Sequence, residues 1–147
     1  MRWGRNSRLD NIQAAILGHK LKTYSSVIER RREIAQMYHD RLKDLEQLKL
    51  PPGPTENKDN FDVYQNFELE ADNRDELKNF LSKKNIGTLI QWGGMAIHHF
   101  KQLGFNQVLP NTDQFFRRCI MLPMNIFISN DDIEYICETI ISFYKND

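Results

Sequence analysis

The sequence has only two cysteines, no long apolar run and no excess of either charge. Cys119 and Cys137 are too few for a disulfide framework, and without a C-x-x-C spacing they form no zinc-binding pattern. No stretch approaches the roughly 18 apolar residues of a membrane-spanning helix. The 20 Lys and Arg balance the 20 Asp and Glu, which removes the usual argument for a nucleic-acid or membrane partner. We therefore expect a cytoplasmic protein with neither partner.

The composition is that of an ordinary folded domain. Hydrophobic residues make up 40% of the 147 residues, aromatic residues 11% and charged residues 27%. Chains that stay disordered combine low hydrophobicity with high net charge, and this chain shows neither. Its length is that of a single domain with one packed core.

A helix is predicted close to the start of the chain. Ser7 to Asp10 has the form of a capping box, in which Ser7 accepts a hydrogen bond from a free amide and Asp10 lies in the first turn. Residues 23–26 then weaken the helical preference. We expect a break near Tyr24.

A second, longer helix is predicted after that break. From Val27 apolar residues recur every three or four positions as far as Leu48, and the prolines of residues 51–54 prevent the helix from continuing. The run Arg30-Arg31-Arg32 on this helix could bind phosphate. We interpret it as a solvated, charged face.

Strands and helices alternate along the remainder of the chain. The spacing of apolar residues, capping residues and glycines gives the order of elements. We predict a strand over residues 62–71, a helix capped by Asp72 that stops at residues 83–85, a strand over 86–92, short helices over 95–103 and 111–118, a central strand over 119–122, and a last helix that starts at the capping box of residues 129–132.

These elements predict an α+β fold, with two leading helices followed by a small sheet covered by helices. We expect a helical segment over residues 1–50, a connector over 51–61 and an α+β unit over 62–147.

Few side chains suggest chemistry by themselves. His98 and His99 follow Gly93 and Gly94, but adjacent residues on a helix point about 100° apart, so we expect one packed ring, one solvated ring and no metal site. The two cysteines lie in apolar patterns and are interpreted as inert small hydrophobic residues. Polar and cationic residues 3–8 precede a helix N-terminus, a place that attracts phosphate.

Residues 4–17, GRNSRLDNIQAAIL, resemble the G-x-N-x-R-L-x-x-x-Q-A-A segment of the DegT/DnrJ/StrS sugar aminotransferases, which are pyridoxal-phosphate (PLP) enzymes of the aspartate aminotransferase fold. Residues 29–35 are similar to the E-R-R-R-x-I-A helix of that family, and the similarity continues at residues 73–77, 86–88 and 122–124. The resemblance covers essentially the whole chain. It implies the C-terminal small domain of fold-type I PLP-dependent transferases.

In that family the large domain comes first and carries the lysine that bonds to PLP, upstream of the G-x-N-x-R motif. The resemblance therefore implies the C-terminal part of a longer enzyme, without the large PLP-binding domain, without a catalytic residue of its own and inactive alone. Lys20, Lys22 and Lys101 do not match the family's lysine segment.

The resemblance also implies roles for three residues. Asn6 and Arg8 match positions whose side chains reach the cofactor phosphate of the other subunit, with a purely structural helix cap as the alternative. His98 lies near a family histidine, in a P-x-H segment that lines the sugar-nucleotide site, although the proline is absent here.

The activity implied is amino transfer from an amino acid, with glutamate as the donor, to a keto sugar nucleotide for polysaccharide biosynthesis. A homodimer is implied as well. The alternative is a stand-alone α+β binding or interaction domain that derives from the family and has no catalytic activity.

Overall fold

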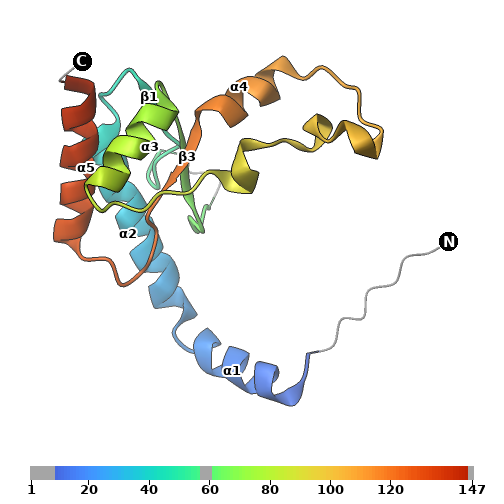
Figure 1. Cartoon of the computed structure of the whole chain (residues 1–147). Helices are drawn as coiled ribbons and strands as arrows, with labels where there is room; N and C mark the ends of the chain where they lie inside the picture. Colours follow the sequence, from blue (N-terminus) through green and yellow to red (C-terminus); the bar gives the residue numbers. More distant parts are fainter. Residues whose placement is uncertain (1–8, 57–60, 146–147) are drawn as a thin grey trace.

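The computed structural model describes residues 9–56 and 61–145 and confirms the α+β class. Figure 1 shows α2 and α5 side by side, with α1 extending away from them and the small sheet next to α3. The elements in chain order are α1 (Asn11–Leu21), α2 (Tyr24–Leu42), β1 (Leu48–Lys49), β2 (Phe67–Ala71), α3 (Arg74–Lys83), three short 3₁₀ turns η1 (Gln91–Gly94), η2 (Ile97–His99) and η3 (Lys101–Leu103), α4 (Pro110–Arg118), β3 (Cys119–Leu122) and α5 (Asn130–Lys145).

The first helix starts later than the capping-box pattern indicates. Asp10 is its N-cap, because the Asp10 carboxylate accepts a hydrogen bond from the amide of Gln13 at 3.0 Å. Asp10 is therefore not a first-turn residue, and Ser7 lies outside the described residues. The break predicted near Tyr24 is confirmed, since α1 ends at Leu21 and α2 begins at Tyr24.

The second helix ends at Leu42, six residues before the predicted end, and Leu48 belongs to the short strand β1. Leu45 and Leu48 still pack against the core through two successive turns. The apolar spacing therefore continues past Leu42 although the backbone is no longer helical.

The sheet has three antiparallel strands in the order β1-β2-β3, so β2 is the central strand. The prediction that residues 119–122 form a central strand is wrong. Among the residues that the structure describes, β3 pairs with β2 on one side, and on the other side only Leu89 pairs with it, through a bridge to Met121. The strand predicted over residues 86–92 reduces to this bridge. Trp92 and Gly93 have φ of 52° and 64°, a left-handed turn that takes the chain away from the sheet.

The core lies between one face of the sheet and the helices α2, α3 and α5. The buried face of β2 carries Phe67, Leu69 and Ala71, as the alternation predicts, and the opposite face carries Glu68 and Glu70. Fully buried side chains on the helices complete it: Ile34, Tyr38, Leu42, Leu77, Leu81, Ile133 and Ile140. One contiguous core thus unites α2 with the elements that follow residue 61.

Two helix starts differ in how well the sequence predicts them. The capping box before α5 is confirmed, since Ser129 Oγ accepts from the amide of Asp132 at 3.0 Å. Asp72 does not cap α3. Asn73 occupies that position in a left-handed conformation, and the Asp72 carboxylate instead pairs with Arg118 at 3.0 Å.

The arginine triplet on α2 is not a solvated face, contrary to the prediction. Each of its guanidinium groups donates to backbone carbonyl oxygens of a distant segment. Arg30 contacts Ile128 at 2.6 Å, Arg31 contacts Tyr64 and Gln65 at 3.0 and 2.7 Å, and Arg32 contacts Asp62 and Pro54 at 2.6 and 2.9 Å. The triplet therefore holds loop segments against α2 and directs its guanidinium groups toward the backbone of this chain.

None of the helices among residues 9–56 and 61–145 combines the length and the hydrophobicity of a membrane-spanning segment.

Candidate functional site

Residues 91–109 form an arm that leaves the sheet after Leu89 and returns through α4 (Figure 1). Its first turn has Trp92, Gly93 and Gly94 in left-handed conformations, which glycine adopts without strain. Its apolar side chains are widely exposed, with 76% of Trp92 and 68% of Ile97 accessible. Such exposure on one segment is typical of a contact surface.

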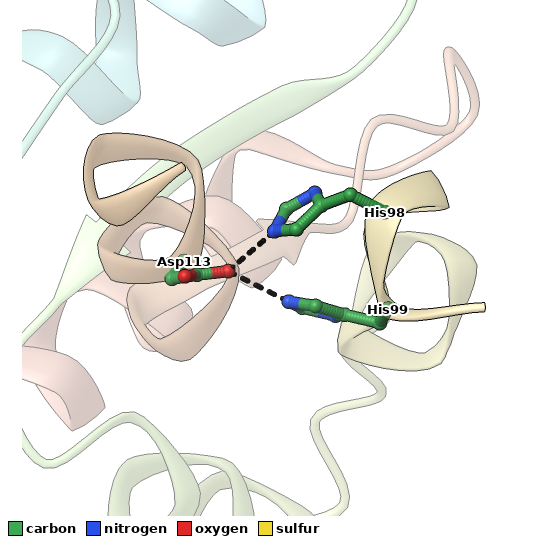
Figure 2. A group of neighbouring side chains, drawn as sticks. All are labelled: His98, His99 and Asp113. Atoms are coloured by element: carbon green, nitrogen blue, oxygen red, sulfur yellow. Dashed lines mark hydrogen bonds and ion pairs between the residues drawn. The ribbon is translucent and has the colours of Figure 1, made fainter. Parts of the chain in front are cut away.

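A cluster of three polar side chains joins this arm to α4. Nε2 of His98 and Nε2 of His99 each lie 2.7 Å from the same oxygen, Oδ1 of Asp113. Figure 2 shows both rings directed at this oxygen. The side chain of His98 is 7% exposed and that of His99 is 32% exposed. The ring centroids are 4.3 Å apart.

His98 is the packed ring that the sequence predicts, and His99 is only partly exposed. The expectation that the two rings would diverge is wrong. It assumed a regular helix, whereas His98 and His99 lie in a single 3₁₀ turn with Phe100 as its C-cap. The two rings converge because the Asp113 carboxylate lies within hydrogen-bonding distance of both.

The cluster favours a negatively charged Asp113. Hydrogen bonds from His99 and then from His98 lower the pKa of the Asp113 carboxyl below its ordinary value. Asp113 also lies in the first turn of α4, where the helix dipole stabilises a negative charge. Sequence reasoning missed this residue, although a helix start at Pro110 followed by an acid in the first turn is a recognisable pattern.

The same three side chains present ligand atoms of the kinds that bind divalent metals, all within 4.8 Å of one another. A further hydrogen bond opposes metal binding. The amide of Ala96 donates to Nδ1 of His99 at 3.1 Å, so the proton of a neutral His99 belongs on Nε2, the atom that a metal would need. We interpret the cluster as a hydrogen-bonded one.

A pocket of about 550 Å³ lies between the arm and α4. His98 is one of its walls, and Thr112 adds a hydroxyl from the first turn of α4. The other walls are mainly large and apolar: Trp92, Met95, Ile97, Phe100, Leu109 and Phe116. An apolar pocket with a few polar groups is the usual form of a small-molecule site.

The residues matched to the cofactor phosphate, Asn6 and Arg8, lie outside the described residues. Within the described residues, the cationic side chains named so far do not gather into a site for the PLP phosphate. The arginine triplet of α2 donates to backbone carbonyls, and Lys20, Lys22 and Lys101 are exposed side chains. These cationic groups alone therefore do not fit the cofactor.

The cysteines have the environment that the sequence predicts. Both thiols are free and buried. Burial raises the pKa of Cys137 to about 12 and also raises the pKa of Cys119, which keeps both groups protonated and poorly nucleophilic.

The apolar side chains of α1 have no cover in the described chain. Ile12 is 74% exposed, Leu9 is 62% exposed and Ile16 is 53% exposed, and α1 has no buried residue. A helix with so much apolar surface is typical of a segment that contacts another domain or subunit.

Comparison with known proteins identifies similar chains. The model of the DegT/DnrJ/EryC1/StrS aminotransferase family matches residues 1–141. GDP-perosamine synthase of Escherichia coli O157:H7 is 33% identical over 97% of the chain, and dTDP-3-amino-3,6-dideoxy-alpha-D-galactopyranose transaminase of Aneurinibacillus thermoaerophilus is 32% identical over 93%. The chain covers 38% and 37% of those two proteins. A DegT DnrJ EryC1 StrS aminotransferase from Brucella abortus superposes with a TM-score of 0.81 at 32% identity, over 97% of this chain and 38% of that one.

Proposed function

This chain belongs to the DegT/DnrJ/EryC1/StrS aminotransferase family, and on that premise we propose that it is the C-terminal portion of a nucleotide-sugar aminotransferase. The proposed reaction moves an amino group from glutamate to a keto sugar nucleotide, with PLP as the electron sink. The observation that carries the proposal is the family match over residues 1–141, together with two relatives above 30% identity whose names are those of sugar-nucleotide enzymes. The proposed setting is the cytoplasm, where free cysteines are the rule.

The catalytic lysine and the main PLP-binding surface are proposed to lie in parts of the enzyme other than these 147 residues. The 147-residue chain by itself should then neither transfer an amino group nor form a borohydride-reducible adduct between PLP and one defined lysine. A stoichiometric adduct at a single lysine of this chain, with turnover of an amino donor, would contradict this part of the proposal.

The chain's own contribution is to bind and orient. Asn6 and Arg8 are proposed to hold the cofactor phosphate of a partner subunit in a homodimer. His98, at the wall of the apolar pocket, is proposed to contact the sugar-nucleotide substrate. The exposed faces of α1 and of the arm supply surface for the remainder of the enzyme and for the second subunit.

The proposed domain organisation follows from these contacts. Residues 1–50 supply interdomain and dimer-contact helices, 51–61 form a connector and 62–147 form the small domain. Since α2 packs on β2 and α5, we propose that α2 belongs to the core of the small domain as well as to the helical segment.

A stand-alone binding or interaction domain without catalytic activity is the second candidate. The closed core shared by α2, the sheet, α3 and α5 favours it, because such a unit can fold without further chain. The nucleotide sequence upstream of the Met1 codon separates the two candidates. An open frame that encodes the family's lysine segment supports the aminotransferase, and a ribosome-binding site without such a frame supports the stand-alone domain.

The phosphate role of Arg8 is tested in the native polypeptide that carries these residues. A charge-assisted hydrogen bond contributes about 1.5–3 kcal/mol, so Arg8→Ala should weaken PLP retention about 10- to 100-fold, and Asn6→Ala should weaken it less. Unchanged cofactor affinity in Arg8→Ala would refute the phosphate role.

A mixed dimer tests whether Arg8 acts across the subunit boundary. One chain carries Arg8→Ala and the other lacks the PLP-bonding lysine. If Arg8 acts on the partner subunit, the remaining lysine-bearing site receives its Arg8 from the other chain and stays active. An inactive mixed dimer beside an active wild-type dimer would refute the cross-subunit role.

A further inference from the structure

The hydrogen bonds around His99 determine where its proton lies. Nδ1 of His99 accepts the amide proton of Ala96 at 3.1 Å, which occupies the lone pair of that nitrogen. A proton on Nδ1 would face the amide proton directly and break this bond. His99 is therefore neutral with its proton on Nε2, and it donates that proton to Oδ1 of Asp113 at 2.7 Å.

The same reasoning extends through Asp113 to His98. The carboxylate already accepts one N–H at Oδ1, and its lowered pKa keeps it ionised. Nε2 of His98 lies 2.7 Å from that oxygen, a distance that requires a proton between the two atoms. Since Oδ1 carries none, the proton belongs to Nε2 of His98.

One ring nitrogen of the pair is left to act on a ligand. Nδ1 of His98 is on the side of the ring away from Asp113 (Figure 2), and it has no hydrogen-bond partner among residues 9–56 and 61–145. His98 lines the pocket of about 550 Å³, whereas Asp113 and His99 do not. The walls around His98 are mainly apolar, so a hydrogen bond made there faces little competition from other protein groups.

We propose that Asp113 is a positioning residue that holds neutral His98 in the tautomer with its proton on Nε2. In that tautomer Nδ1 is the one nitrogen of the cluster that accepts a hydrogen bond or a proton from a group bound in the pocket. His99 supports Asp113 from the other side and fixes the carboxylate by a second N–H. The group that meets Nδ1 is a hydroxyl or an N–H, because a neutral imidazole nitrogen without a proton is an acceptor.

This inference depends on the proposed function only for the identity of the bound group, which there is a sugar-nucleotide substrate. The tautomer of His98 is a property of the chain without a ligand. A negative result in an amino-transfer assay would therefore leave it untouched, and a wrong tautomer would leave the family function untouched.

The experiment is ¹⁵N NMR of the whole 147-residue chain with ¹⁵N-labelled histidine, at a pH of about 9, above the ordinary histidine pKa range. In the wild type we expect a protonated-type signal for Nε2 and an unprotonated-type signal for Nδ1 in both His98 and His99. In Asp113→Ala the two ¹⁵N signals of His98 should move toward a common averaged chemical shift, because both tautomers are then populated. The NMR signal of the Nε2 proton should disappear, because that proton exchanges with water. His99 should keep its pattern, because Ala96 still donates to Nδ1.

Two further variants separate positioning from folding. Asp113→Asn keeps an amide oxygen that can accept from both rings, so it should preserve the wild-type pattern even if Asp113→Ala disturbs the arm. Asp131→Ala removes a matched first-turn acid from α5 and should leave both histidines unchanged. The proposal is overturned if wild-type His98 carries its proton on Nδ1, if Asp113→Ala leaves the His98 signals unmoved, or if Zn²⁺ displaces the Nε2 protons of the wild-type cluster.

Discussion

Replacing Arg31 by methionine should loosen the segment that leads into the central strand. Its guanidinium donates to the carbonyl oxygens of Tyr64 at 3.0 Å and Gln65 at 2.7 Å, and Arg31→Met removes both donors while it keeps the apolar stem. A hydrogen bond to a charged group contributes about 1.5–3 kcal/mol. The bond to Gln65 is exposed, so we count mainly the partly buried bond to Tyr64. The expected loss of unfolding free energy is about 2 kcal/mol.

Thermal and urea unfolding of the chain, followed by circular dichroism, measure this loss. For a chain of this size about 2 kcal/mol corresponds to a decrease in Tm of roughly 4–8 °C, with an unchanged urea m value. The control is Arg117→Met, which removes an exposed arginine from the last turn of α4 and should cost less than about 1 kcal/mol. Equal losses in the two variants, or no loss at Arg31, would refute the view that this arginine anchors the backbone.

Three further predictions concern the core, the exposed helix and the polar cluster. Leu69→Ala, at a position only 2% exposed in the central strand, should cost about 2–5 kcal/mol, measured as a lower urea midpoint. Ile12→Lys on the exposed face of α1 should reduce self-association of the chain in sedimentation velocity, and a strictly monomeric wild type would contradict this. The lowered pKa of Asp113 means that its contribution to stability is present above the ordinary aspartate pKa and is lost as the pH falls through the lowered folded-state value. The difference in urea midpoint between the wild type and Asp113→Asn should therefore narrow in acid, and a constant difference down to about pH 2 would contradict it.

Local patterns predicted those parts of the fold whose signals are local. The capping box at Ser129 and the apolar stripe after it defined α5, and alternation from Phe67 to Ala71 gave the buried face of β2. The predicted end of α2 is wrong because Leu45 and Leu48 keep the helical spacing, although Leu45 lies in a turn and Leu48 in a strand when they pack on the core. The spacing of apolar residues predicts which side chains are buried. It does not determine whether the backbone at those positions is a helix, a turn or a strand.

The polar features depend on contacts between distant segments, and the sequence alone does not show these. In the sequence the arginine triplet has the pattern of a solvated face, because the backbone carbonyls that accept its hydrogen bonds have no sequence signature. Asp113 lies 14 and 15 residues from His99 and His98, so only the return of the chain through α4 brings them together. The family resemblance points to His98, whereas only the folded chain places the Asp113 carboxylate beside it.

The most direct test of the central claim is to follow nitrogen from donor to sugar. The native polypeptide that carries these residues is purified, supplied with PLP, ¹⁵N-labelled glutamate and a keto sugar nucleotide, and the products are analysed by mass spectrometry. The account predicts an amino sugar nucleotide that contains ¹⁵N, formed by the native polypeptide and absent when the 147-residue chain is used alone. A native polypeptide that binds the sugar nucleotide but transfers no ¹⁵N, from glutamate or from any other amino acid, would contradict it.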